Sequence, residues 1–239
     1  ELESNLSNIL ITGTSSGIGK ALAKTYSETG YEIYGLSRTK SDEYNHVECD
    51  LERVYDISYK LSTLLKDVKE IDVVYLNAGV LGDIDYLNKI KLNDLETFFT
   101  INTWANKIII DYMIENNIEV KQVVAISSGA SQETYTGWGA YSISKAALNM
   151  MMKVYAEEQP DIHFLSLSPG PVDTPMQDFI NENIDGNKFK WKKKFSDMKE
   201  NKTLPTTSSV ADRMCRLLPT LKKYKSGSFL DLRNLQFLI

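Results

Sequence analysis

The chain is poor in the residues that build disulfide frameworks and metal centres, because its 239 residues include only two cysteines and two histidines. Cys49 and Cys215 cannot staple a small secreted domain, so we expect two packing residues in a reducing, cytoplasmic compartment. His46 and His163 lie far apart in the sequence and lack the short spacing of paired metal ligands. We therefore expect no metal site.

Long apolar runs and an excess of positive charge are also missing. No segment approaches the roughly 20 apolar residues that cross a bilayer, and no signal-peptide pattern is visible, so we expect no membrane partner. The formal net charge of -5 argues against general nucleic-acid binding. What is present is an ordinary globular composition, 42% hydrophobic and 25% charged, in a chain long enough to bury a large core.

Strand-like and helix-like patterns alternate from one end of the chain to the other. Strands are predicted at 8–12, 31–36, 46–49, 72–76, 121–127, 162–168 and 228–232. Helices are predicted at 17–29, 53–67, 92–117, 140–157 and 207–218. Such alternation is typical of a parallel sheet between two helical layers. We therefore predict an α/β fold: a single doubly wound Rossmann-type domain over 1–239, with a seven-stranded, mostly parallel sheet and helices on both faces.

A glycine-rich turn, TGTSSGIG at 12–19, connects the first predicted strand to the first helix. Strand, glycine turn and helix form the context of a dinucleotide phosphate loop, where glycines let the backbone approach a pyrophosphate at the helix N-terminus. The spacing is G-x-x-x-G-x-G, which matches the general G-x-G-x-x-G fingerprint only in kind. An ordinary strand–helix turn is the alternative. The residues expected to contact the cofactor here are Gly13, Ser15, Ser16, Gly17, Ile18 and Gly19.

A tyrosine and a lysine stand four residues apart in the predicted helix 140–157. Positions i and i+4 share a helix face, so Lys145 can lie beneath the ring of Tyr141. A phenol with a pKa of about 10 transfers protons poorly at neutral pH, and we expect the nearby cation to lower the pKa of Tyr141. Ser128 follows an apolar run and can hydrogen-bond the carbonyl oxygen that Tyr141 would protonate. A chance pair on a surface helix is the alternative when the pair is considered alone.

Together these residues resemble the short-chain dehydrogenase/reductase family in order and spacing, over nearly the whole chain. The matching elements are TGTSSGIG at 12–19, Asp50-Leu51, Asn77-Ala78-Gly79, Asn102, Ser127-Ser128, Tyr141 with Lys145, and PGPVDT at 169–174. Segments 137–141 and 172–177 are most similar to the sepiapterin reductase and benzil reductase branch. The resemblance implies an NADP(H)-dependent oxidoreductase that reduces a small-molecule ketone, aldehyde or dicarbonyl compound to an alcohol.

The resemblance also implies a role for each matching residue. The catalytic group is Ser128, Tyr141, Lys145 and Asn102, and the thirteen-residue interval to Tyr141 selects Ser128 over Ser127. The backbone carbonyl of Asn102 would hold a water that joins Lys145 to solvent. The cofactor would contact, besides the glycine turn, Tyr141 and Lys145, the residues Asp50, Leu51, Asn77, Ala78, Gly79, Pro169, Gly170, Val172 and Thr174.

The end of the second predicted strand carries the residues that read the adenosine ribose in dinucleotide folds. An acid there accepts the 2′-hydroxyl of NAD and repels a 2′-phosphate. This chain has Ser37 and Arg38 instead. A hydroxyl and a guanidinium suit a phosphate, so NADP(H) is the predicted cofactor. The alternative is a surface arginine and a site that does not distinguish the two cofactors.

The segment 170–206 breaks the alternation, because it has no strand pattern and carries five lysines between 188 and 194. So long an insertion in a compact domain is more often functional than accidental, and we predict a lid over the substrate. The alternative is a solvated helix face whose aromatic residues Phe189, Trp191 and Phe195 pack inward.

Three aromatic residues predict the character of the substrate pocket. Tyr135, Trp138 and Trp191 indicate an aromatic-lined pocket for a flat or aromatic carbonyl compound, with core packing as the alternative.

Two expectations concern self-association and protein class. In the family, helices corresponding to 92–117 and 140–157 form a two-fold contact, which predicts a homodimer or homotetramer. Residues that make these helices apolar over more than one face are Ile108, Ile109, Met113, Met150, Met151 and Met152.

The alternative to an oxidoreductase is a non-catalytic NADP-binding sensor on the same scaffold. Such proteins lose the tyrosine or the lysine, and both are present here.

Overall fold

A computed structural model describes residues 7–235; residues 1–6 and 236–239, the ends of the predicted 1–239 domain, lie outside the described residues. Seven strands form one sheet in the order β3-β2-β1-β4-β5-β6-β7. Their bounds are Asn8–Thr12 (β1), Glu32–Ser37 (β2), Asn45–Glu48 (β3), Glu70–Leu76 (β4), Glu119–Ile126 (β5), His163–Ser168 (β6) and Ser228–Asp231 (β7). Every neighbouring pair is parallel, so the predicted sheet is confirmed and is more regular than the expected mostly parallel one.

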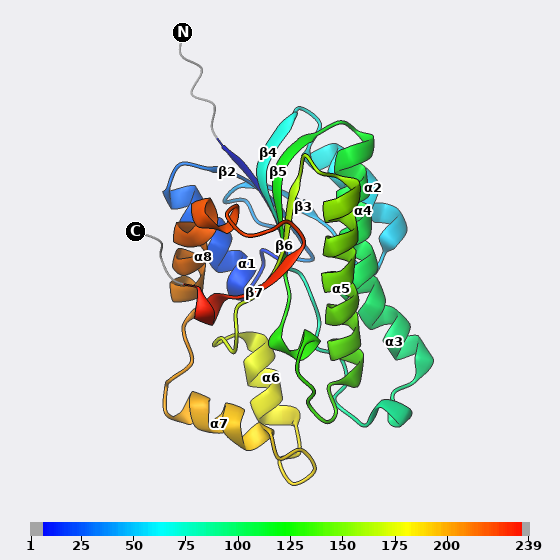
Figure 1. Cartoon of the computed structure of the whole chain (residues 1–239), viewed down its shortest axis with the longest axis vertical. Helices are drawn as coiled ribbons and strands as arrows, with labels where there is room; N and C mark the ends of the chain where they lie inside the picture. The colour runs from blue at the N-terminus through cyan, green and yellow to red at the C-terminus, as the bar shows by residue number, and fades with distance from the viewer. Residues whose placement is uncertain (1–6, 236–239) are drawn as a thin grey trace.

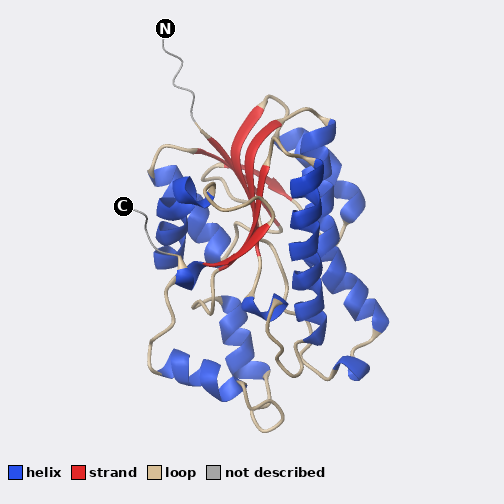
Figure 2. Ribbon diagram, in the orientation of Figure 1, coloured by secondary structure: helices blue, strands red, loops and turns tan. Residues whose placement is uncertain are grey.

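Helices cover both faces of the sheet (Figures 1 and 2). One face carries α1 (Gly17–Glu28) and α8 (Thr207–Leu221), and the other carries α2 (Val54–Leu64), α4 (Ala105–Glu115) and α5 (Gly139–Glu158). Successive strand residues point to opposite faces, so Ile9 and Ile11 join the core under α1 and α8 while Leu10 joins the other. Within residues 7–235, no helix combines the length and apolar character that a membrane crossing needs.

The prediction of one continuous helix over 92–117 is wrong. It consists of α3 (Leu92–Phe99), a π-helical turn η2 (Thr100–Trp104) and α4. A π turn inserts an extra residue and is frequent at functional sites. Here it carries Asn102, whose side chain leaves the helix to hydrogen-bond the backbone of Val80, with Oδ1 accepting at 2.8 Å and Nδ2 donating at 2.9 Å. The apolar pattern continues through the insertion and therefore did not predict the break.

The segment 170–206 lies beyond the carboxyl ends of the strands and contains α6 (Pro175–Asn183) and α7 (Lys192–Glu200) (Figure 1). Its two ends meet at an isolated parallel bridge between Asp173 and Thr206. The backbone nitrogen of Asp173 donates to the carbonyl of Pro205 at 3.0 Å, which closes the base of the segment. The insertion is thus anchored next to the loops that end the strands.

Candidate active site

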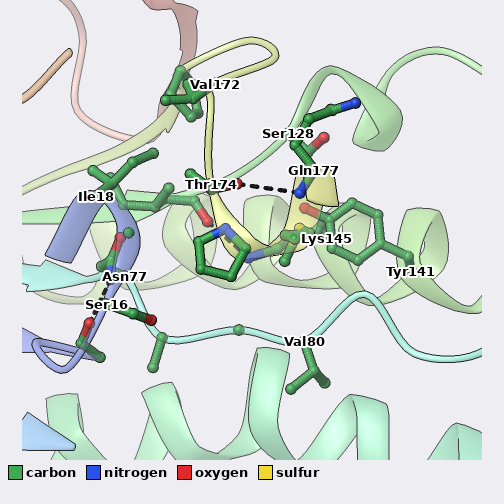
Figure 3. A pocket seen from close by; sticks show the side chains of 18 of the residues that line it. Ser16, Ile18, Asn77, Val80, Ser128, Tyr141, Lys145, Val172, Thr174 and Gln177 are labelled. Carbon is green, nitrogen blue, oxygen red and sulfur yellow. Dashed lines mark hydrogen bonds between the residues drawn. The ribbon is translucent and has the colours of Figure 1, made fainter. Parts of the chain in front are cut away.

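Nearly all predicted site residues line one cavity of about 450 Å³ at the carboxyl ends of the strands (Figure 3). The loops after β1, β2, β3, β4, β5 and β6 contribute to its walls. Successive strands are added toward one edge of the sheet from β1 to β3 and toward the other edge from β4 to β7. Open α/β sheets bind ligands at the point where this order switches, which here lies between β1 and β4. Only Gly19 and Asn102 among the predicted residues stand behind the walls.

The glycine turn leaves space on one side and packs tightly on the other. Gly13 and Gly17 have positive φ angles of 75° and 58°, which L side chains rarely adopt. A Cβ at Gly17 would meet only the Thr174 side chain at 3.8 Å, so the turn is open toward the cavity. A Cβ at Gly19 would lie 2.3 Å from the Gly13 carbonyl oxygen, so this glycine lets α1 pack against the turn.

Thr12, which the sequence analysis did not single out, fastens the glycine turn to the loop after β4. Its hydroxyl oxygen accepts hydrogen bonds from the backbone nitrogens of Asn77 at 3.0 Å and Ala78 at 2.9 Å. The Asn77 amide in turn donates to the Thr12 carbonyl at 2.9 Å. These bonds fix two of the loops that the resemblance assigned to the cofactor.

Ser37 and Arg38 have different surroundings. The Ser37 hydroxyl donates to the carbonyl of Thr39 at 2.8 Å and also contacts His46 Nε2 at 2.9 Å. Its proton is thus directed to its own loop, while Ser37 still lines the cavity, and its expected contact with a phosphate stays a prediction. Arg38 lies exposed at the cavity wall, and its guanidinium has no hydrogen bond or ion pair within the part of the chain that the structure describes. Arg38 is therefore free to meet an anionic ligand.

Tyr141 and Lys145 occupy one face of α5, as their spacing predicts, and both are buried. The Lys145 Nζ atom lies 5.9 Å from the centre of the Tyr141 ring and donates to the carbonyl of Ile126 at 2.8 Å. A Cβ at Gly79 would lie 3.2 Å from this Nζ, so the glycine admits the lysine head group beside the loop.

The structure separates the roles of the two neighbouring serines. The Ser127 hydroxyl is buried and donates to Asn149 Oδ1 at 2.6 Å. The Ser128 oxygen accepts from the backbone nitrogen of Ala130 at 3.1 Å, which leaves its proton available. Ser128 lines the cavity beside Tyr141 (Figure 3). The geometry thus favours Ser128, which the family interval selects.

Burial shifts the pKa values of the tyrosine and the lysine in opposite directions. Desolvation raises the pKa of Tyr141, and a hydrogen bond with Ser128 lowers it in part. The pKa of Tyr141 is thus raised and not lowered as expected, because burial is the largest influence on it. Desolvation lowers the pKa of Lys145 to about 8. At neutral pH the tyrosine is therefore protonated, as a proton donor must be, and the lysine still carries its charge.

Asn102 does not line the cavity, but its side chain links the loop after β4 to α5. Besides its two bonds to Val80, its Nδ2 donates to Ser144 Oγ at 3.0 Å, which ties the loop after β4 to α5. Its backbone carbonyl, predicted to hold a water, accepts a hydrogen bond from Asn106 Nδ2 at 2.9 Å. A carbonyl oxygen has two lone pairs, so a water held there would have to use the one that Asn106 does not occupy.

Aromatic side chains form the wall opposite the glycine turn. Tyr135 and Trp138 line the cavity, and the Trp138 ring meets Tyr141 edge-on at 5.6 Å. Trp191 stands behind and packs on Trp138 at 5.1 Å. Phe189 and Phe195 are buried, so the aromatic residues of the insertion pack inward. The exposed lysines of this segment are Lys188, Lys190, Lys193, Lys194 and Lys202.

Several lining residues could not be recognised as such from the sequence, because they come from distant elements. Gln177 and Ile180 come from α6, Phe195 from α7, and Arg233 from the short helix η4 (Leu232–Asn234). Gln177, Ile180 and Phe195 belong to the segment 170–206, which the sequence predicts to be a lid, but no motif marks them individually as lining residues. Arg233 lies outside that segment, and only the fold brings it to the cavity.

Comparison with known proteins identifies the family. Residues 7–185 match the family model described as short chain dehydrogenase, so the chain belongs to this family of oxidoreductases. Similar proteins include a Bacillus subtilis benzil reductase ((S)-benzoin forming), 29% identical over 94% of this chain and 98% of the relative. A Mus musculus sepiapterin reductase is 26% identical over 93% and 95%. The predicted branch is thus confirmed.

A solved structure has the same fold. The YIR035C short chain dehydrogenase/reductase from Saccharomyces cerevisiae superposes with a TM-score of 0.85, is 27% identical, and covers 95% of this chain and 96% of its own. The alignment therefore includes nearly all of the sheet, both helical layers and the insertion. The fold predicted from the alternating pattern is confirmed by this likeness as well as by the topology.

Proposed function

We propose that the chain is an NADP(H)-dependent carbonyl reductase that converts a ketone, an aldehyde or a dicarbonyl compound to an alcohol. One observation carries the proposal: Ser128, Tyr141 and Lys145 converge on a cavity whose other end is bordered by an open glycine turn and the unpaired Arg38. The aromatic wall of Tyr135 and Trp138 suits a flat or aromatic substrate. The Bacillus subtilis relative, a benzil reductase, supports the same substrate class.

The residues that border the cavity fit a phosphorylated dinucleotide. The glycine turn would hold the pyrophosphate, Arg38 the 2′-phosphate, and Val172 with Thr174 the nicotinamide amide. Asp50 and Leu51 line the cavity where the adenine would lie. When bound, the reduced cofactor supplies the hydride that adds to the carbonyl carbon.

The chain supplies the proton and the charge stabilisation. Tyr141, protonated at neutral pH, donates its proton to the carbonyl oxygen. The Ser128 hydroxyl donates a hydrogen bond to the same oxygen as negative charge develops there. The Lys145 ammonium stabilises the phenolate that remains. The aromatic wall keeps water away from these groups, which strengthens each electrostatic contact.

The proposed function is tested by following NADPH absorbance with a panel of diketones, pterins and simple ketones. We expect steady oxidation of NADPH with at least the aromatic carbonyl compounds. The protein could instead bind NADPH, as measured by cofactor fluorescence, and oxidise it with no compound of the panel. That result would contradict the reductase and favour the cofactor sensor.

Arg38→Ala is expected to weaken NADPH binding and leave NADH binding nearly unchanged. The charge-assisted contact to the 2′-phosphate is worth about 1.5–3 kcal/mol, which is roughly a ten- to hundred-fold change in affinity. Titration calorimetry with both cofactors measures the effect. Arg53→Ala is the control, because Arg53 is exposed but does not line the cavity. Equal affinity of the wild-type protein for NADH and NADPH would refute the role of Arg38.

We propose that the segment 170–206 closes over the substrate. Gln177 and Ile180 of α6 and Phe195 of α7 border the cavity, so this insertion forms part of its roof. NADP⁺ and a diketone are expected to slow amide hydrogen exchange across 175–200 more than in the sheet, because binding would hold the roof against the site. Hydrogen–deuterium exchange mass spectrometry measures this difference. If the ligands leave amide exchange across 175–200 unchanged, the insertion is a fixed structural element and not a lid.

We also propose that α5 mediates self-association. Ile109, Met113 and Met152 are buried in the chain's own core, so part of the predicted apolar excess has a simpler explanation. An exposed stripe remains along α5, where the exposed fractions are 45% for Ile143, 57% for Met150 and 45% for Val154. Light scattering at micromolar concentration is expected to give a dimer or tetramer mass, and Met150→Lys is expected to lower it. A monomer mass for the wild-type protein would disprove the association.

A further inference from the structure

Two cations on the cavity wall have no part in the proposed reaction. Lys194 precedes the buried Phe195 on α7, and Arg233 belongs to the short helix η4. A Cβ at Gly170 would lie 2.9 Å from Arg233 Cδ, so this arginine lies against the loop after β6. Tyr135 connects the two, because its ring is 6.3 Å from that of Phe195 and its side chain interacts electrostatically with Arg233. Both cations therefore belong to the substrate end of the cavity, beside its aromatic wall.

The guanidinium of Arg233 is held in one orientation by Asp231. Its Nε atom donates to Asp231 Oδ1 at 2.9 Å, and its Nη2 atom donates to Oδ2 at 2.5 Å. The backbone nitrogen of Arg233 donates to the same carboxylate at 2.9 Å. One edge of the guanidinium is thus occupied, and its Nη1 atom has no partner among residues 7–235. The second edge can therefore donate to a carboxylate supplied by a ligand.

Lys194 has an unpaired ammonium group, unlike other lysines of the same insertion. Lys188 pairs with Asp85 at 2.5 Å, and Lys199 pairs with Asp178. Lys194 is exposed and forms no hydrogen bond or ion pair with any residue in the described range 7–235. Its charge is therefore not neutralised by an ion pair, although it borders the cavity.

Charge is distributed unevenly along the cavity. The acids that line it are Asp50 and Glu52 of the loop after β3, at the end where adenine is expected. At the substrate end, the charged lining residues are Lys145, Lys194 and Arg233. A cleft lined by charges of one sign attracts a ligand of the opposite sign. The substrate end thus favours an anion, although the whole chain has a net charge of -5.

We propose that Lys194 and Arg233 form a subsite for a carboxylate group of the substrate, separate from the carbonyl that is reduced. Lys194 supplies the net positive charge, because Asp231 offsets the charge of Arg233, and Arg233 supplies two N–H donors in a fixed direction. Tyr135 packs against the apolar part that joins the two ends of the substrate. The substrate is then an aromatic carbonyl compound that carries a carboxylate, which the reaction leaves unchanged. This inference rests on the proposed carbonyl reduction and adds the second group that is recognised.

The test compares 4-acetylbenzoate and the longer 4′-acetylbiphenyl-4-carboxylate with their carboxamides, which have nearly the same shape and no charge. Calorimetry on the complex with NADP⁺ gives dissociation constants without turnover, and NADPH oxidation gives kcat/KM. We expect at least one carboxylate to bind about three- to ten-fold more tightly than its carboxamide. Lys194→Met is expected to remove most of this preference and to leave the carboxamide unchanged. Arg233→Lys keeps the charge but loses the fork of donors, so it is expected to reduce the preference in part.

Lys193→Met is the matched control, because it removes the same charge from the same helix at an exposed residue that does not line the cavity. We expect it to retain the preference for the carboxylate. An equal loss in Lys193→Met and Lys194→Met would overturn the subsite, since a long-range field and not a contact would then act. Circular dichroism shows whether each variant is folded, and Lys194→Gln replaces Lys194→Met if the latter is not.

Three further results would overturn the assignment. They are equal affinity for carboxylate and carboxamide at both lengths, no binding of either carboxylate by the wild-type complex, and a loss of NADP⁺ affinity in Lys194→Met. The last would mean that Lys194 serves the cofactor. Failure of the wild-type protein to oxidise NADPH contradicts the proposed function alone, because the binding comparison needs no reduction.

Discussion

Tyr141→Phe is expected to lower kcat for carbonyl reduction roughly 10²–10⁴-fold and to leave NADPH affinity close to that of the wild-type protein. The variant removes only the proton donor. The phenyl ring keeps its edge-on packing against Trp138, so the wall of the cavity is preserved. Stopped-flow or steady-state absorbance measures kcat, and fluorescence titration measures the affinity for NADPH.

Tyr155→Phe is the matched control for this prediction. Tyr155 lies on the same helix α5, but its hydroxyl donates to Asp111 at 2.5 Å, away from the cavity. Its loss is expected to change stability and not kcat. A Tyr141→Phe protein that retains most of its activity would show that another group donates the proton.

Lys145→Met is expected to damage both turnover and cofactor binding. The unbranched methionine keeps the buried stem of the lysine but removes the charge that lies beside the Tyr141 ring and the donor to the Ile126 carbonyl. Turnover falls because the phenolate that forms after proton transfer loses its cation, and NADPH affinity falls because Lys145 is one of the residues expected to contact the cofactor. A variant in which only one of the two quantities changes would remove one of these two roles.

The same lysine predicts a pH dependence. Burial lowers the pKa of Lys145 to about 8, so its charge is present below this pH and is lost above it. The kcat/KM for carbonyl reduction is therefore expected to fall as the pH rises through about 8, while Tyr141, whose pKa is raised, stays protonated. The pH profile of Lys145→Met is expected to lack this step. Most of a titration takes place within about one pH unit on either side of the pKa. A wild-type profile of kcat/KM that is flat between pH 7 and pH 9 would therefore contradict the role of the Lys145 charge.

The features that could be predicted from the sequence are those written in local patterns. The alternation of strands and helices gave the sheet, because parallel strands buried on both faces are continuous apolar runs such as Ile9-Leu10-Ile11. The i, i+4 spacing placed Lys145 against Tyr141 because helix geometry alone decides that contact. Motif spacing brought Ser128 to the same cavity.

The features that could not be predicted depend on packing between distant segments. The π turn at Asn102 arises because its side chain binds the backbone of Val80, a contact with no signal in the helix pattern. The direction of the Tyr141 pKa shift follows from how completely the fold buries the ring, which spacing does not report. Ser37 turned inward because Thr39 and His46 surround its hydroxyl in the folded loop. Phe195 and Arg233 reached the cavity only through the fold.

A crystal structure of the protein with NADP⁺ and a 1,2-diketone tests the central claim most directly. We expect one carbonyl oxygen within hydrogen-bonding distance of both Ser128 Oγ and the Tyr141 hydroxyl, with the 2′-phosphate at Arg38. A cofactor bound outside the cavity between the glycine turn and Tyr141, or a diketone whose carbonyl oxygens contact neither Ser128 nor Tyr141, would contradict it.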